Sequence, residues 1–266
     1  MKLHVETQGD GPDLVLVHGW GVNSGVWQML LPTLVRRYRV SCVDLPGHGA
    51  SRALPMPASL AALAKLVLEA APTSAVWLGW SLGGLICLRI ALDFPAHMQA
   101  LMLSNSTPRF VSAPDWPYAM SCAQLEAFAA ELAGDFSGTV RRFLALQTLG
   151  DEHAAATLRV LRDSVSARGE PDAASLATAL ALLRDSDVRD ELHRLRLPTR
   201  ILTGDYDRLT PPQAGGAMAN MISESSWISF PRTAHAPFIS HPADFVRVLD
   251  EFMDTIGFDQ AARYAD

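Results

Sequence analysis

The sequence has few cysteines and no long apolar run. Cys42, Cys87 and Cys122 form neither a paired framework nor a metal-spaced motif, so a disulfide scaffold and a zinc ribbon are excluded and a reducing cytoplasm is expected. No stretch reaches the roughly 18 apolar residues of a membrane span. Residues 1–6 lack the apolar core of a signal peptide and are expected to form a strand.

Lysine is also scarce, since Lys2 and Lys65 are the only lysines in the sequence. The formal net charge is −6. Such a chain lacks the basic surface that general binding to nucleic acid requires. There are no internal repeats and no low-complexity tracts. Apolar residues make up 49% of the 266 positions, which is enough to bury the core of one large domain.

Short apolar runs alternate with segments of helical spacing along most of the chain. This alternation predicts an α/β fold with a mostly parallel central sheet and helices on both faces. We expect strands over residues 14–18, 38–45, 75–80, 100–105, 199–203 and 227–230, and helices over residues 24–36, 60–71, 82–93, 211–221 and 242–256.

The alternation stops between residues 110 and 184, where only helical segments occur. An all-helical block inside an alternating chain indicates an insertion, which we expect to be a lid over the carboxyl edge of the sheet. The predicted division is a first core segment at 1–109, the lid at 110–185, a second core segment at 186–257 and a frayed tail at 258–266.

The stretch from Ala75 to Leu85 places a serine between a buried strand and a helix. Gly79 and Gly83 flank Ser81 in a G-x-S-x-G pattern. A side chain at either glycine would collide with the backbone of so sharp a turn, which lifts the hydroxyl above the sheet. Free N–H groups at the start of the helix can bind an oxyanion. The pattern predicts a nucleophilic serine; a glycine-rich joint without chemistry is the alternative.

A serine nucleophile needs a general base, and the base needs an acid to orient it. His235 follows the last predicted strand, and both Asp205 and Asp207 follow the strand before it. Open α/β sheets place their sites at the carboxyl ends of strands. The chain order Ser, Asp, His is the one expected for a serine triad on this architecture. We expect His235 as the base and Asp207 as the acid, with Asp205 as its rival. His241 is expected to be a surface or capping residue.

The loop His18-Gly19-Trp20-Gly21 follows the first apolar strand and is expected to complete an oxyanion hole. Its glycines let the backbone approach the substrate, so the N–H groups of Trp20 and Leu82 are expected to bind the developing negative charge. His18 has no partner at the spacing of metal ligands and is expected to be a hydrogen-bonding scaffold residue. Neither a metal nor another cofactor is expected.

Taken together, these motifs resemble the α/β-hydrolase fold family over essentially the whole chain. A closer resemblance is to the carboxylesterases that cleave the methyl ester of pimeloyl-acyl carrier protein in biotin synthesis. The first resemblance rests on His18–Gly21, Asp44-x-Pro46-Gly47-x-Gly49-x-Ser51, Gly79–Gly84, Gly204-x-x-Asp207 and Ala234-His235, and the second on Leu78–Leu85, Arg142–Thr148 and Ala234–Pro242.

The closer resemblance implies a triad of Ser81, Asp207 and His235. It also implies that arginines of the lid face the acyl carrier protein as a transient partner. Arg142 and Arg159 match such arginines, and Arg141 and Arg162 lie on neighbouring turns. The substrate contacts that it implies are Trp20, Ser81, Leu82, Phe143, Leu144, Ala145, Leu146, Gln147 and His235.

The sequence therefore predicts a cytoplasmic, monomeric serine carboxylesterase that hydrolyses pimeloyl-acyl carrier protein methyl ester through an acyl-enzyme. Binding to nucleic acid or to a membrane is not expected. One alternative keeps the triad and changes the substrate, as in a general short-chain esterase or a carbon–carbon bond hydrolase. Another is a non-catalytic binding protein on the same fold. A dehalogenase would need an acidic residue at the position of Ser81.

Overall fold

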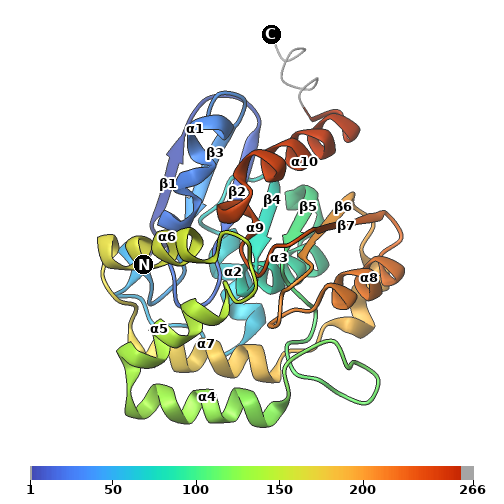
Figure 1. Ribbon diagram of the computed structural model, residues 1–266. Helices are drawn as coiled ribbons and strands as arrows, with labels where there is room; N and C mark the ends of the chain where they lie inside the picture. The colour runs from blue at the N-terminus through green and yellow to red at the C-terminus, as the bar shows by residue number, and fades with distance from the viewer. Residues whose placement is uncertain (1, 259–266) are drawn as a thin grey trace.

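A seven-stranded sheet runs through the centre of the protein, and helices cover both of its faces (Figure 1). The computed structural model describes residues 2–258. All neighbouring strands are parallel except β1, which pairs antiparallel with β3 at one edge. In the order β1-β3-β2-β4-β5-β6-β7, the strands are Val5–Gln8, Arg39–Val43, Asp13–Val17, Ala75–Trp80, Met98–Ser104, Thr199–Gly204 and Ser225–Phe230.

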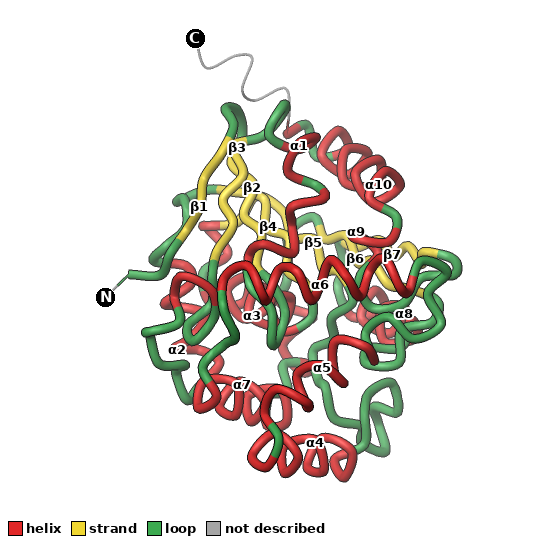
Figure 2. The backbone as a smooth tube through the Cα atoms, turned by 60° about the vertical axis from the view of Figure 1, so that its left-hand side comes forward, coloured by secondary structure: helices red, strands yellow, loops and turns green. Residues whose placement is uncertain are grey.

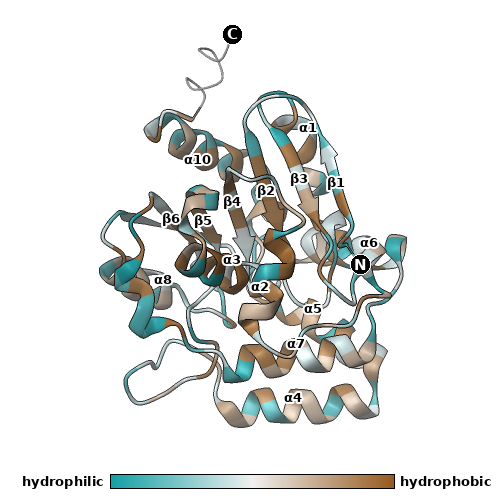
Figure 3. Ribbon diagram, turned by 180° about the vertical axis from the view of Figure 1, so that it is seen from behind, coloured by the Kyte–Doolittle hydropathy of each residue, from teal (hydrophilic) through white to brown (hydrophobic). Residues whose placement is uncertain are grey.

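Helices α2, α3 and α8 lie on one face of the sheet, and α1 and α10 lie on the other (Figures 1 and 3). Among the described helices, none combines the length and the apolar character needed to cross a membrane. The bounds are η1 Ser24–Met29, α1 Leu31–Leu34, η2 Gly49–Ser51, α2 Leu60–Leu68, α3 Leu82–Asp93, η3 Pro95–His97, η4 Arg189–Arg194, α8 Pro212–Met221, α9 Pro237–Ser240 and α10 Pro242–Thr255.

The central strands are buried on both faces, which explains their apolar sequences. Every residue of β4 is buried, as are four of the five residues of β2. Strands covered by helices on both sides carry continuous apolar runs instead of an alternating pattern. Figure 3 shows the hydrophobic residues concentrated in these strands and in α3, which packs against them. The edge strand β7 keeps polar, partly exposed positions.

Four helices occupy residues 110–185, which we call the helical insertion. They are α4 Cys122–Gly134, α5 Phe136–Leu146, α6 Ala154–Arg168 and α7 Ala173–Asp185. Helices α4, α5 and α7 lie together beyond one end of the sheet, whereas α6 packs against η1 and α9 (Figure 2). Residues 110–185 contain isolated β-bridges and no strand. That this insertion acts as a lid stays a prediction.

The structure corrects the predicted helix at residues 24–36. The segment is divided into the 3-10 helix η1 and the single turn α1, which has Pro32 in its first turn. Proline lacks an N–H group, and its ring clashes with the carbonyl of the residue four positions earlier, so a continuous helix cannot pass through it.

The predictions at the two ends of the chain also change. The first strand begins at Val5, later than predicted, and it is antiparallel to its neighbour. Phe258 belongs to the predicted tail but is buried, with its ring centroid 6.3 Å from that of Tyr38. The rest of that predicted tail, 259–266, lies outside the described residues, as does Met1.

Candidate active site

Ser81 occupies the turn between β4 and α3 in a backbone conformation that few residues adopt. Its φ is +56° and its ψ is −118°. A Cβ atom on Gly79 would lie 2.5 Å from the Gly83 carbonyl oxygen, and one on Gly83 would lie 2.2 Å from the Val17 carbonyl oxygen. The two glycines are therefore required by close backbone packing. A strained residue of this kind costs about 1–3 kcal/mol and is typical of functional sites.

Neighbouring strands hold the Ser81 backbone in place. The Ser81 N–H donates to the Ser104 carbonyl at 3.1 Å, and the Ser106 hydroxyl donates to the Ser81 carbonyl at 2.7 Å. A Cβ on Gly84 would lie 2.4 Å from the Ser106 side chain. The turn is thus fixed by contacts from β5 and the residues after it, which the sequence analysis did not identify.

Asp207 and His235 form a buried hydrogen-bonded pair with 2.7 Å between Oδ2 and Nδ1. The Asp207 carboxylate accepts four further hydrogen bonds. They come from Asn105 Nδ2 at 2.8 Å and Thr210 Oγ1 at 2.6 Å to Oδ2, and from the N–H groups of Leu209 at 2.9 Å and Thr210 at 3.1 Å to Oδ1.

The environment keeps Asp207 ionised. Burial opposes the charge and raises the pKa of this carboxyl, but the interaction with His235 and the hydrogen bonds from Thr210 and Asn105 outweigh it and hold the pKa below its usual value. Asp205, the rival candidate, is exposed and accepts a hydrogen bond from Ser229 Oγ. The geometry therefore pairs Asp207, and not Asp205, with the histidine.

Asn105 is a site residue that the sequence analysis missed. It follows β5 in the left-handed conformation, with a φ of +47°. Its amide donates to Asp207 and also to the Ala234 carbonyl at 3.1 Å, so one side chain links the acid to the segment that carries His235. The polar run from Ser104 to Thr107, directly after a buried strand, is the signal that could have identified it.

His235 is held from two further sides. The Trp80 indole N–H donates to the His235 carbonyl at 2.7 Å, and the His235 N–H donates to the Gln147 carbonyl at 3.0 Å. The Ser81 hydroxyl makes no hydrogen bond to His235 or to any other described residue in this structure. Such catalytic contacts are often long in unliganded enzymes and tighten when substrate binds.

Two buried histidines shape the loop at residues 18–21. His18 Nε2 accepts from the Leu45 N–H at 3.0 Å, so its Nδ1 carries the proton and donates to the Gly19 carbonyl at 2.8 Å. His48 Nε2 faces the Gly21 N–H at 3.4 Å, and its Nδ1 donates to the Pro46 carbonyl at 2.8 Å. His18 thus has the expected hydrogen-bonding role, whereas His48 was not anticipated.

Both histidines are neutral because of their surroundings. Burial lowers the pKa of His18, and burial together with the nearby His18 lowers the pKa of His48 to about 3. Their ring centroids lie 5.3 Å apart. They act as fixed donors and acceptors that set the path of the loop.

Trp20 connects this loop to the helical insertion. Its indole N–H donates to the Leu176 carbonyl of α7 at 3.0 Å, and its ring centroid lies 4.8 Å from that of Phe143 and 5.4 Å from that of Phe128. The predicted oxyanion donor is therefore held against the segment predicted to contact substrate.

The segment 143–147 combines an apolar surface with one unsatisfied polar group. Phe143, Ala145 and Leu146 are half-buried, and Leu144 and Gln147 are buried. The Gln147 side chain is 1% exposed, yet neither its amide nitrogen nor its amide oxygen has a hydrogen-bond partner. A buried amide without protein partners is rare in folded proteins, where ordered water, an ion or a ligand commonly supplies the missing hydrogen bonds.

The predicted docking arginines differ in their surroundings. Arg142 is paired within the helical insertion, to Glu131 at 3.1 Å and Asp135 at 3.2 Å, so its charge is compensated. The other three, Arg141, Arg159 and Arg162, are exposed and make no ion pair with any described residue.

Arg168, at the end of the same helix as Arg159 and Arg162, has a structural role. It is partly buried and pairs with Glu6 at 2.8 Å and Asp44 at 3.4 Å. It also donates to Ser24 Oγ at 2.7 Å. These contacts attach the end of α6 to the core.

The chain is similar in sequence to known α/β-hydrolases. The profile of the α/β-hydrolase fold matches residues 12–242. The chain is 40% identical to a pimeloyl-[acyl-carrier protein] methyl ester esterase from Nitrosomonas europaea over 94% of this chain and 98% of that protein. It is 42% identical to a protein of the same name from Chromobacterium violaceum over 96% of this chain and 99% of that protein.

Solved structures agree on the fold. A hydrolase from Pseudomonas aeruginosa superimposes with a TM-score of 0.79 at 28% identity, covering 94% of each chain. An esterase from Exiguobacterium antarcticum gives a TM-score of 0.86 at 23% identity, covering 95% of each chain.

Proposed function

Because this chain belongs to the α/β-hydrolase fold family and, within it, to the family of pimeloyl-[acyl-carrier protein] methyl ester esterases, we propose that it hydrolyses the methyl ester of pimeloyl-acyl carrier protein. The products are pimeloyl-acyl carrier protein and methanol. The identity of about 40% over nearly the whole of both chains carries this proposal. The buried Asp207–His235 pair beside the Ser81 turn supports it with matching chemistry.

In the proposed mechanism His235 Nε2 removes the proton from Ser81, and the serine oxygen attacks the ester carbonyl. The N–H groups of Trp20 and Leu82 bind the resulting oxyanion. His235 then gives its proton to the methoxy oxygen, so methanol leaves and an acyl-enzyme remains. Water activated by the same histidine hydrolyses the acyl-enzyme, while Asp207 keeps its charge and stabilises the imidazolium.

The substrate pocket that we propose lies between the loop at Trp20 and the segment 143–147. The half-buried rings of Phe128 and Phe143, which pack against the buried Trp20, offer an apolar surface to the acyl chain. The unpartnered amide of Gln147 offers a hydrogen bond to a polar group of the substrate, because both of its polar atoms are buried without partners. The remaining predicted contacts are Leu144, Ala145 and Leu146.

The direct test measures methanol release by the purified chain from pimeloyl-acyl carrier protein methyl ester and, in parallel, from free short-chain methyl esters. We expect a clear preference in kcat/KM for the carrier-bound ester, together with restored growth without biotin in a host that lacks its own esterase of this kind. Equal or higher kcat/KM on free esters would favour a general esterase. A chain that fails to react with a fluorophosphonate at Ser81 would be a binding protein.

The carrier protein is proposed to dock on the exposed arginines of the helical insertion. Arg159 and Arg162 are three residues apart on α6, so they share one face of that helix. Acyl carrier proteins are small and acidic, so opposed charges would speed their association with this face. Arg141 contributes to the same charge, whereas Arg142 is neutralised by its acidic neighbours. This differs from the sequence prediction, in which Arg142 and Arg159 were the arginines that match those of the related enzymes.

Reversing the charge of these arginines should slow only the carrier reaction. For Arg159→Glu combined with Arg162→Glu, we expect kcat/KM on the carrier-bound ester to fall by about tenfold or more, because association loses its electrostatic steering. Hydrolysis of a small free ester should be unchanged. Added salt should weaken only the carrier reaction of the parent, since the Debye length is about 8 Å at physiological ionic strength.

The matched control is Arg36→Glu with Lys65→Glu, which changes the net charge equally at exposed positions outside the helical insertion. It should leave both reactions close to the parent. Equal losses on the carrier-bound and the free ester would show that the α6 arginines serve the fold and not docking. We further propose that the chain acts as a monomer in the cytoplasm, where Cys42, Cys87 and Cys122 remain free thiols.

A further inference from the structure

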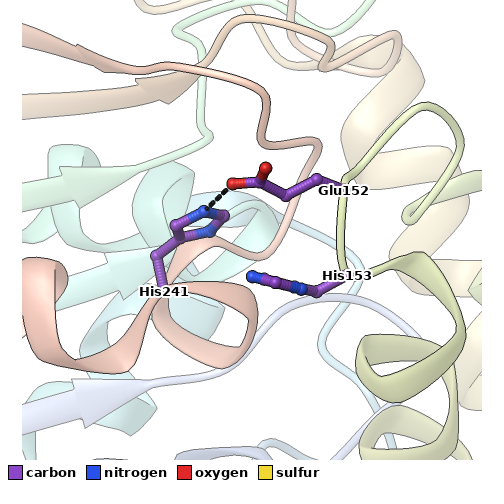
Figure 4. Close-up of side chains that lie close together, drawn as sticks. All are labelled: Glu152, His153 and His241. Carbon is purple, nitrogen blue, oxygen red and sulfur yellow. Dashed lines mark hydrogen bonds and ion pairs between the residues drawn. The ribbon is translucent and has the colours of Figure 1, made fainter.

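Glu152, His153 and His241 form a cluster of possible metal ligands outside the triad (Figure 4). One ligand atom from each residue can be chosen so that all three atoms lie within 4.8 Å of one another. The closest pair is Glu152 Oε1 and His241 Nε2, 2.7 Å apart. The His153 and His241 ring centroids are separated by 5.1 Å. The side chains are solvent-accessible, so an ion can reach them.

Two distant segments supply this cluster, and other contacts hold them in position. Glu152 and His153 directly precede α6, whereas His241 directly precedes α10, 89 residues after Glu152. The Glu152 N–H donates to the Arg232 carbonyl at 3.1 Å. The Ala234 N–H donates to Asp151 Oδ2 at 3.0 Å. The backbone around the cluster is therefore fixed before any ion binds.

The donor set suits a divalent transition metal. Two imidazoles and one carboxylate are ligands of Zn²⁺ and Co²⁺, with water completing the coordination. His241 Nδ1 lies 2.9 Å from Ser240 Oγ, which leaves Nε2 directed toward Glu152. A hydrogen bond to the second ring nitrogen commonly orients metal-bound histidines. A bound metal ion would take the place of the hydrogen bond between His241 Nε2 and the Glu152 carboxylate.

One cation competes for the same carboxylate. Arg232 Nε lies 3.3 Å from Glu152 Oε2, and its side chain is 67% exposed. An exposed ion pair of this kind is weak, with a typical value of about 0–1 kcal/mol. The guanidinium can therefore turn into solvent when a divalent ion binds.

We propose that Glu152, His153 and His241 bind one divalent transition-metal ion that joins the helical insertion to the core. The ion would bridge the start of α6 and the start of α10. The same two segments are also joined by hydrogen bonds: the His235 N–H donates to the Gln147 carbonyl, and the Ala234 N–H donates to Asp151 Oδ2. Binding would thus tie together the two segments that position His235.

The experiment titrates the untagged Cys122→Ser protein with Co²⁺ and Zn²⁺, because this substitution removes the exposed thiol as a competing ligand. We expect one equivalent of Co²⁺ to bind and give visible absorption bands that Zn²⁺ abolishes. Calorimetry should show that each of Glu152→Gln, His153→Ala and His241→Ala weakens binding by at least about tenfold. Saturating Zn²⁺ should raise Tm by about 5 °C, since a ligand of the folded state stabilises it.

Glu152→Gln keeps a hydrogen-bonding partner for His241 and removes the anionic ligand, so it separates folding from metal binding. His193→Ala is the matched control, because it removes an exposed histidine from elsewhere on the surface. It should bind as the parent does. The proposal fails if the parent binds no ion at 100-fold molar excess of Co²⁺ and Zn²⁺, or if the three variants bind with unchanged affinity.

Discussion

Ser81→Ala is expected to lower kcat by about 10⁴- to 10⁶-fold while the protein stays folded, because triad members act as a unit. Among the described residues the serine hydroxyl has no hydrogen-bond partner, so its removal costs the fold no hydrogen bond within residues 2–258. The turn itself is held by the main-chain groups of Ser81, through Ser104 and Ser106. Steady-state methanol release and a thermal melt measure the two quantities.

His235→Ala should give a loss of the same order, and the double variant should lose little more. This non-additivity distinguishes a shared catalytic role from two independent structural roles. The control is Ser226→Ala, which removes an exposed serine hydroxyl on β7, away from the Ser81 turn. Activity of Ser81→Ala within tenfold of the parent would contradict the assignment of the nucleophile.

Asp207→Asn is expected to lower kcat by about 10⁴-fold, whereas Asp205→Asn should change it little. An amide at position 207 no longer accepts the Nδ1 proton of His235 with a full charge, so the imidazole takes the wrong tautomer and its protonated form loses its partner. The same amide would also meet the donors Asn105 and Thr210, which already point at Oδ2. Loss of stability is therefore expected as well.

Because the Asp207 variant can lose activity through unfolding, its kcat is measured below the melting temperature, with circular dichroism as the check on folding. Asp205→Asn is the matched control, two residues away, exposed and bonded to Ser229. A larger loss in Asp205→Asn than in Asp207→Asn would show that the acid has been assigned wrongly.

The parts of the site that local chemistry dictates were predictable from sequence. The spacing of Gly79, Ser81 and Gly83 expresses steric limits within a single turn, so it can be interpreted without knowledge of the rest of the fold. Strand ends are local too, and they placed Asp207 and His235 at the same edge of the sheet.

Contacts between segments far apart in the chain could not be predicted. Asn105 donates a hydrogen bond to the Asp207 carboxylate, 102 residues later in the chain, and no periodicity of the sequence indicates such a contact. Arg142 is nearer to its partners in the chain: it was expected to be a free charge, but it pairs with Asp135 at the N-cap of its own helix and with Glu131 on α4. The helix predicted at residues 24–36 failed for a local reason, since Pro32 outweighs the apolar spacing around it.

The two neutral histidines beneath the loop at residues 18–21 make the fold sensitive to acid. In the unfolded chain each would have a pKa of about 6.5. Below that pH the unfolded chain therefore binds protons at His18 and His48 that the native protein does not bind. The free energy of unfolding should therefore fall as the pH drops below 6.5. For His48 alone the loss is about 2 kcal/mol between pH 7 and pH 5, with a further loss from His18.

Urea unfolding at pH 7 and pH 5 measures this loss, and equal free energies at the two pH values would contradict it. The lower pH limit of the enzyme would then be set by proton uptake on His18 and His48, which hold the loop at residues 18–21. Mild acidification should disorder that loop before it protonates a carboxylate as strongly stabilised as Asp207.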